Sequence, residues 1–343
     1  MNNYVYVFSL LVVTMIFSDL LVYFLFFIGF CFIAVGADWF VDSAVNISKR
    51  SGIPKAVIGA TIVSFATTAP EFMVSFLAAI QGHSDMAIGN AVGSTICNIG
   101  IAVGFIVMLK TVAIDDKKFS VKALMMLLAG GVLVLVSLNG VITRLHGTIF
   151  LILFAAYIFY IYWEQKRNPK KESGEKESDD SGIVQKGIWS HVKINGKYLD
   201  AIVFLIGGAL VVIGSRLIVD NGLLIAVKIG IPEIIISLTV ISIGTALPEI
   251  ITAFTSFRKG FQELSVGNIV GSNILDITMI LGVSSMFVDL NVNSQLLRYD
   301  YIFMLLLFVL LVFFGYKKRI TRSQGALIAL IYIIYVAGLF LFV

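Results

Sequence analysis

The chain has 343 residues, 59% of them hydrophobic and 13% charged, and its mean hydropathy is +0.98. Because this apolar share far exceeds that of soluble domains, the composition excludes a soluble enzyme and predicts a polytopic protein of the lipid bilayer. The formal net charge of +4 indicates no nucleic-acid partner, since Lys and Arg in such a chain mark membrane orientation.

Ten apolar runs, each bounded by charged or turn residues, predict ten membrane-spanning helices. They cover residues 20–44, 56–80, 87–109, 121–139, 147–163, 200–223, 233–257, 265–288, 297–315 and 324–343. Residues 164–199 are rich in Lys, Glu, Ser and Asp, so we expect a solvated linker between the fifth and sixth runs. Residues 1–19 are expected to form an N-terminal extension of the first helix.

The positions of the basic residues orient these helices. When the ten runs alternate across the membrane, 21 of the 25 Lys and Arg residues fall on the side of the linker, three fall on the other side, and one lies within a run. By the positive-inside rule, the linker is cytoplasmic and both termini face outward. We expect a multi-pass protein of the plasma membrane.

A sequence repeat relates the two halves of the chain, residues 20–163 and 200–343. When Glu71 is laid over Glu249 without gaps, many polar, Gly and Pro residues of the first half meet identical residues of the second, nine of them in or beside the central motifs. These are Thr61, Ser64, Thr67, Pro70, Glu71, Gly89, Asn90, Gly93 and Ser94, which recur as Thr239, Ser242, Thr245, Pro248, Glu249, Gly267, Asn268, Gly271 and Ser272. Each half contains five predicted helices, and because five is odd, the second half must enter the membrane from the opposite side. The sequence therefore predicts an all-α polytopic membrane protein with ten transmembrane helices in two inverted-topology repeats of five, an architecture of secondary transporters.

A Pro-Glu pair stands in the second helix of each half. Pro70 precedes Glu71, and Pro248 precedes Glu249. A proline within a helix removes one backbone hydrogen bond and frees a carbonyl one turn upstream. A carboxylate at membrane depth costs at least about 2.5 kcal/mol on insertion scales and brings no packing benefit. The duplicated pair therefore indicates function, and two buried carboxylates favour cation binding.

Other oxygen-bearing side chains lie at helical spacing from these glutamates or from one another. Thr67 and Thr245 lie one turn before their glutamates. The third helix of each half adds pairs four residues apart, Ser94 with Asn98 and Ser272 with Asp276. No histidine or cysteine pair accompanies them, and oxygen-only ligation favours hard cations such as calcium. The carboxylates of Glu71, Glu249 and Asp276 suit one divalent ion, or several sodium ions in its place, and this competition is the physical basis of antiport.

Packing roles compete with ligand roles for the neutral residues. A single Thr or Ser within a membrane helix packs or back-bonds more often than it binds an ion, and the repeated glycines favour close helix approach. Asp276 is a weaker candidate than the two glutamates, because its repeat partner Asn98 is neutral.

Together these motifs resemble those of the cation/calcium antiporter superfamily, most closely the compact prokaryotic sodium/calcium exchangers. The resemblance runs from about residue 20 to the C-terminus. It depends on Thr-Thr-Ala-Pro-Glu at 67–71 and Thr-Ala-Leu-Pro-Glu at 245–249, with their partner segments GNAVGSTICN and GNIVGSNILD. The resemblance implies ten helices in two inverted halves, which agrees with the count made from hydropathy and charge.

The resemblance also implies a role for each matching residue. Glu71 and Glu249 would be the central calcium ligands, helped by Thr67 and Thr245. Residues of both halves would form flanking sodium sites, namely Ser64, Thr68, Ser94, Ser242 and Ser272. Ser64 and Ser242 match positions that often contribute a backbone carbonyl, so their hydroxyls need not bind. Asn98 and Asp276 match a central polar pair that also accommodates water or a proton.

The sequence departs from the family pattern after the signature threonines. The family usually has Ser at both positions, whereas this chain has Thr68 and Ala246. Thr68 keeps an oxygen, but Ala246 removes one from the half that would form the outer sodium site. We therefore expect weaker sodium affinity there, with coupling shared by protons or potassium.

The leading hypothesis is a secondary antiporter, not an enzyme, that exchanges calcium for sodium by alternating access, needs no cofactor and functions as a monomer. The alternative keeps the fold and changes the coupling ion, giving a calcium/proton or a potassium-dependent sodium/calcium exchanger. A cation channel is a remote alternative, because channels usually build acidic rings from several subunits, whereas this chain carries its own inverted pair. The linker is too short for the calcium-sensing domains of large animal exchangers.

Overall fold

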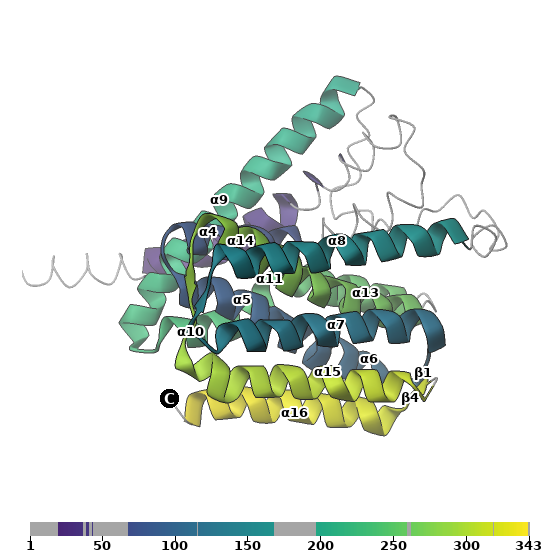
Figure 1. The fold of residues 1–343 in the computed structure, drawn as a ribbon. Helices are drawn as coiled ribbons and strands as arrows, with labels where there is room; N and C mark the ends of the chain where they lie inside the picture. Colours follow the sequence, from purple (N-terminus) through teal and green to yellow (C-terminus); the bar gives the residue numbers. More distant parts are fainter. Residues whose placement is uncertain are drawn as a thin grey trace, which may run out of the picture.

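The computed structural model describes residues 20–36, 39–40, 43, 68–114, 116–167, 197–258, 262–317 and 319–341, and nearly all of them are helical (Figure 1). The predicted extension 1–19 and most of the predicted linker 164–199 lie outside the described residues.

Within the described residues, seven helices are long and apolar enough to cross a membrane. They are Ser84–Leu109, Phe119–Ser137, Arg144–Glu164, Asp200–Ile229, Val266–Phe287, Leu296–Gly315 and Arg322–Leu341. A bent pair, Glu233–Thr245 with Leu247–Phe254, gives an eighth candidate, and shorter apolar helices cover Leu20–Gly36 and Ala69–Ile80. Each predicted apolar run thus coincides with helix, at least in part.

The helices that carry the polar motifs are divided into short segments, several of them π-helical (η). In the first half these are α4 (Ala69–Ile80), α5 (Ser84–Cys97), η2 (Asn98–Val103) and α6 (Gly104–Leu109). In the second half they are α10 (Glu233–Ile236), η3 (Ser237–Ile241), α11 (Ser242–Thr245), α12 (Leu247–Arg258), α13 (Gln262–Leu275), η4 (Asp276–Leu281) and α14 (Gly282–Phe287). The other helices are α7 (Asp116–Ser137), α8 (Arg144–Arg167), α9 (Lys197–Ile229), η5 (Leu296–Asp300), α15 (Tyr301–Gly315) and α16 (Arg322–Leu341).

The sequence repeat reappears in the secondary structure. The bounds of α12, α13, η4 and α14 are the repeat equivalents of those of α4, α5, η2 and α6, without a shift at either end. Two short antiparallel sheets follow the same rule, since β1 (Val112–Ala113) pairs with β4 (Arg319–Ile320), and β2 (Val141–Ile142) pairs with β3 (Leu290–Asn291). β1 precedes α7 and β2 follows it, so the two equivalent sheets lie at opposite ends of that helix.

Two spans form the centre of the molecule. The apolar windows of Ser84–Leu109 and Val266–Phe287 are 78% and 83% buried, whereas those of the other spans are at most 39% buried. The helices α8, α7, α15 and α16 form a row beside them (Figure 1), in which α7 packs against both α8 and α15. The two spans that carry Ser94, Asn98, Ser272 and Asp276 are therefore the most buried of the seven.

The helix Leu20–Gly36 crosses α9, and glycines of both helices lie at the points where the two backbones come closest. A Cβ atom added to Gly214 would lie 2.7 Å from the Gly29 carbonyl oxygen, and one added to Gly36 would lie 2.8 Å from the Gly207 carbonyl oxygen. Gly207 and Gly214 are the repeat equivalents of Gly29 and Gly36, so the two contacts are related by the repeat. The absence of side chains lets the two backbones touch.

The structure corrects the predicted end of the sixth run at residue 223, because α9 continues to Ile229. The additional residues contain no helix breaker, and the helix stops only before Gly230, whose φ of +76° is left-handed. Five of the six additional residues are apolar, and the sixth, Lys228, lies in the last turn of the helix, so the predicted end was too early.

Candidate ion-binding site

The two Pro-Glu pairs lie at equivalent helix starts. Glu71 is in the first turn of α4, where Pro70 occupies a position that needs no helical N–H donor. Glu249 is in the first turn of α12. Both glutamates are only 1% exposed, which places two carboxylates in the interior of the protein.

The predicted helix break is confirmed in the second half. The segment Glu233–Thr245 meets Leu247–Phe254 at an angle of 44°. The amide of Ala246 donates to the Ser242 carbonyl at 3.0 Å, and Ile250 donates to the Ala246 carbonyl at 3.0 Å. Pro248 lies between them and has no N–H to donate, so the helix bends where Glu249 enters the core.

A π-helical segment begins at each member of the predicted central pair. η2 starts at Asn98 and η4 starts at Asp276, and both side chains are buried. π-Helical turns are rare and occur frequently at functional sites, because they widen the helix and re-aim side chains. The sequence pattern contained no sign of them, since a π-turn depends on tertiary packing.

The carboxylates are near enough to influence one another. The Glu71 carboxyl interacts electrostatically with those of Glu249 and Asp276. Among the described residues, no three Asp, Glu, His or Cys side chains gather closely enough to hold one metal ion by themselves. A cation bound here therefore takes neutral oxygens in addition to carboxylate, as hard cations do.

Hydrogen bonds join the two halves around the glutamates. Thr68 Oγ1 donates to Glu249 Oε1 at 3.3 Å, and Ser94 Oγ lies 3.5 Å from the Ser242 carbonyl oxygen. The repeat equivalent of Thr68 is Ala246, which has no hydroxyl to offer Glu71. Ala246, the departure from the family pattern, thus leaves Glu71 without the contact that Thr68 makes to Glu249.

The hydroxyls of the second-half signature face the helix backbone. Ser242 Oγ donates to the carbonyls of Leu238 and Thr239 at 2.8 and 3.1 Å. Its own carbonyl accepts from Ser94, and whether that carbonyl also binds an ion stays a prediction. Thr245 Oγ1 lies 3.3 Å from the Ser242 carbonyl oxygen and nearer, at 3.0 Å, to Asn90 Oδ1.

Asn90 is a site residue that the sequence reasoning did not select. Its Nδ2 donates to the Glu71 carbonyl at 3.2 Å and to Ser75 Oγ at 2.9 Å. Its Oδ1 accepts from Thr245 Oγ1 at 3.0 Å. Asn90 therefore connects the glutamate segment of one half to the threonine of the other, and its recurrence as Asn268 was the available sequence signal.

Several buried oxygens of the predicted residues have no hydrogen-bond partner within the described part of the chain. These atoms are Oε1 and Oε2 of Glu71, Oδ1 of Asn98, Oγ of Ser272, and Oδ1 and Oδ2 of Asp276. A buried polar atom without a partner costs free energy, so such a concentration calls for an explanation. Carboxylate, amide and hydroxyl oxygens are the donor set that hard cations prefer, and the residues present fit them.

The structure describes most, but not all, of the predicted site residues. Thr68, Glu71, Ser94, Asn98, Ser242, Thr245, Glu249, Ser272 and Asp276 are all buried in α4, α5, α11, α12, α13 and the segments around them. Ser64 and Thr67 lie outside the described residues, and their roles stay predictions.

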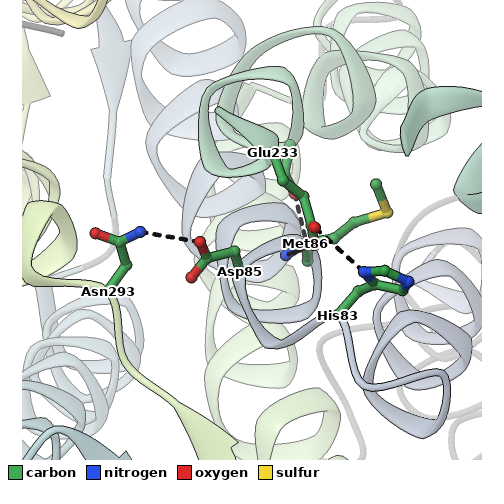
Figure 2. Close-up of polar contacts among 6 residues, drawn as sticks. His83, Asp85, Met86, Glu233 and Asn293 are labelled. Carbon is green, nitrogen blue, oxygen red and sulfur yellow. Dashed lines mark hydrogen bonds and ion pairs between the residues drawn. The ribbon is translucent and has the colours of Figure 1, made fainter. Parts of the chain in front are cut away.

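Contacts from the second half also hold the start of α5 (Figure 2). Glu233 Oε1 accepts from the Met86 amide at 3.0 Å, and Glu233 Oε2 lies 3.2 Å from His83 Nδ1. On the other side of the turn, Asn293 Nδ2 donates to Asp85 Oδ2 at 2.9 Å. These contacts fix the end of the helix that carries Asn90, Ser94 and, through η2, Asn98.

Known proteins resemble this chain over nearly its whole length. A sodium/calcium exchanger MaX1 of Methanosarcina acetivorans is 28% identical over 338 residues, which cover 91% of this chain and 97% of the relative. An uncharacterized membrane protein of Methanocaldococcus jannaschii is 31% identical over 92% of this chain and 96% of the relative. A solved structure of the sodium-calcium exchanger NCX_Mj, soaked with sodium and strontium, has a TM-score of 0.61 and 27% identity, covering 93% of this chain and 99% of that one.

A family model described as sodium/calcium exchanger protein matches the chain twice, over residues 21–163 and 199–341. The two matches cover most of the chain, and their bounds are related by the same repeat as the motifs themselves. The chain therefore belongs to the sodium/calcium exchanger family.

Proposed function

We propose that the protein is a secondary antiporter that exchanges calcium for sodium across the membrane by alternating access. The observation that carries this proposal is that Glu71, Asn98 and Asp276 bury oxygens for which the described residues supply no hydrogen-bond partner, in a chain of this family. The names of MaX1 and NCX_Mj support the same pair of ions.

The architecture that we propose is ten transmembrane helices in two inverted repeats, residues 20–163 and 200–343, joined by a linker at 164–199. It is supported by the helix bounds and sheet pairings, which coincide when one half is laid over the other. The distribution of Lys and Arg supports a cytoplasmic linker and outward termini, and we place the protein in the plasma membrane.

Each site residue has a proposed role. Glu71 and Glu249, with Thr67 and Thr245, hold calcium, because carboxylates contribute the charge that a divalent ion requires. The flanking sodium sites use Ser64, Thr68, Ser94, Ser242 and Ser272. Asn98 and Asp276 lie between them, where a proton or water is also held. Sodium ions and calcium cannot occupy the shared carboxylates together, and this exclusion couples the two fluxes.

The helix Leu20–Gly36 and α9 are the proposed moving elements. Their glycine contacts join them as a pair, and they cross outside the two central buried spans. A joint displacement of this pair against the core would open the site to one side and then to the other, as alternating access requires.

Calcium uptake into proteoliposomes tests the proposal. Vesicles loaded with sodium and diluted into sodium-free buffer are expected to accumulate radioactive calcium, and vesicles with equal sodium on both sides are not. Uptake without any counter-ion gradient would indicate a channel and contradict the proposal.

The same assay separates the proposed coupling ion from its alternatives. Uptake driven by a pH gradient alone would reassign coupling to protons. A requirement for potassium in sodium-driven uptake would indicate a potassium-dependent exchanger. Either result would keep the fold and the carboxylate site but change the ion that drives transport.

A further inference from the structure

Two asparagines, one from each half, form a hydrogen-bonded chain beside the candidate site. Asn98 Nδ2 donates to Asn273 Oδ1 at 3.2 Å. Asn273 Nδ2 in turn donates to the Thr95 carbonyl at 3.2 Å and contacts Met126 Sδ at 3.8 Å. Both asparagine side chains are fully buried, so bulk solvent does not compete for their hydrogen bonds.

The chain of contacts fixes which way each amide points. The Thr95 carbonyl and the Met126 thioether only accept hydrogen bonds, so they hold the NH2 group of Asn273 and turn its Oδ1 toward Asn98. That oxygen also only accepts, so it selects the NH2 group of Asn98. Asn98 Oδ1 is left on the opposite side of its amide, buried and without a partner among the described residues.

We propose that Asn273 is a positioning residue for ion binding, which orients Asn98 so that its amide oxygen, and not its NH2 group, faces the transported cation. The inference rests on the proposed function, because Asn98 belongs to the proposed site. A reversed amide would present positive partial charge to the cation and weaken its binding.

The other half of the repeat carries the complementary arrangement. The position equivalent to Asn273 is Thr95, whose Oγ1 bonds back to the Val92 carbonyl at 2.7 Å. The position equivalent to Asn98 is Asp276, a carboxylate whose two oxygens are chemically the same. Asn98 therefore meets an orienting amide from the opposite half, whereas the residue in the equivalent place for Asp276, which needs no orientation, is Thr95.

A double-mutant cycle tests the inference through the apparent KM for sodium and for calcium in proteoliposomes. Asn273→Ala is expected to raise the apparent KM of at least one ion about tenfold, the scale of one hydrogen bond to a charged group, with a smaller change in maximal rate. In an Asn98→Asp background the same substitution is expected to change that KM less than about twofold, because a carboxylate has no wrong face. Asn273→Thr, the residue that stands at position 95, replaces Asn273→Ala if the latter does not fold.

Met126→Leu is the matched control, since it removes only the weaker of the two contacts that hold the Asn273 NH2 group. Its KM values are expected to match the wild type. Equal KM increases from Asn273→Ala in the Asn98 and Asn98→Asp backgrounds would show a packing role and overturn the inference while the proposed site stands. An Asn98→Asp variant with unchanged dependence on both ions would overturn the inference together with Asn98's place in the proposed site.

Discussion

Glu71 and Glu249 occupy equivalent positions but have different neighbours. Glu249 accepts a hydrogen bond from Thr68, whereas the equivalent donor beside Glu71 is replaced by Ala246. The repeat thus supplies two carboxylates whose immediate surroundings differ, and in the proposed site this difference would let calcium and sodium prefer different oxygens.

The charge of each glutamate is the first property to test. Glu71→Gln and Glu249→Gln preserve side-chain size and remove one negative charge, so each is expected to reduce calcium transport by more than about a hundredfold, in line with a lost charged ligand. The variants are expected to insert and to elute from a sizing column like the wild type. Wild-type transport rates in both variants would refute the assigned site.

A second test restores the hydroxyl that is missing at position 246 and measures sodium affinity. Ala246→Ser places a hydroxyl at the position equivalent to that of Thr68, where Ala246 is fully buried. We expect the apparent KM for sodium to fall about three- to tenfold, the range of one added hydrogen-bonding ligand. Sodium dependence indistinguishable from the wild type would show that Ala246 does not limit sodium affinity.

At the scale of elements, hydropathy located each apolar run but not the type of helix within it. The predicted run 265–288 is one continuous span, Val266–Phe287, but its middle segment, η4, is π-helical. The π-turn at Asp276 is produced by packing in the core, which no local pattern records. Strands of two residues, such as β1, are likewise too short to show a period of two.

The crossing of helix Leu20–Gly36 with α9 can be tested by enlarging one of its glycines. Gly214→Ala puts a methyl group 2.7 Å from the backbone oxygen of Gly29, so the two helices must separate. Because the pair is proposed to move as a unit, we expect exchange rates to fall at least about fivefold, the effect of roughly 1 kcal/mol of lost contact.

Gly131→Ala is the matched control for this substitution. Gly131 lies within α7, and a Cβ atom there would meet nothing within 4 Å among the described residues. An alanine at this position favours the helix by about 0.5–1 kcal/mol, so unchanged transport and equal or higher thermal stability are expected. Equal loss of transport in both glycine variants would argue against a special role for the crossing.

For the molecule as a whole, the fold class and the Pro-Glu segments were predictable because they depend on composition and on a repeat within one sequence. The contacts of Asn90 with Thr245 and of Asn273 with Asn98 were not, since each joins residues of different halves of the chain. The sequence marked Asn90 only by its recurrence, and it did not mark Asn273, which Thr95 replaces in the other half.

The proposed orientation is testable on intact cells. Cys31 is exposed and Cys97 is buried, so both are first replaced by Ala. In that background, Asn139→Cys in the exposed turn after α7 is expected to react with a membrane-impermeant thiol reagent, because the turn faces outward in the proposed topology. Ser173→Cys in the linker is expected to react only after the cells are permeabilised. The reverse labelling pattern would invert the topology.

Equilibrium binding of calcium to the purified protein at increasing sodium concentrations tests the central claim most directly, namely that both ions compete for one carboxylate site. The account predicts that calcium affinity falls as sodium rises and that Glu71→Gln and Glu249→Gln each abolish calcium binding. Calcium binding that is independent of sodium, or that survives in both variants, would contradict it.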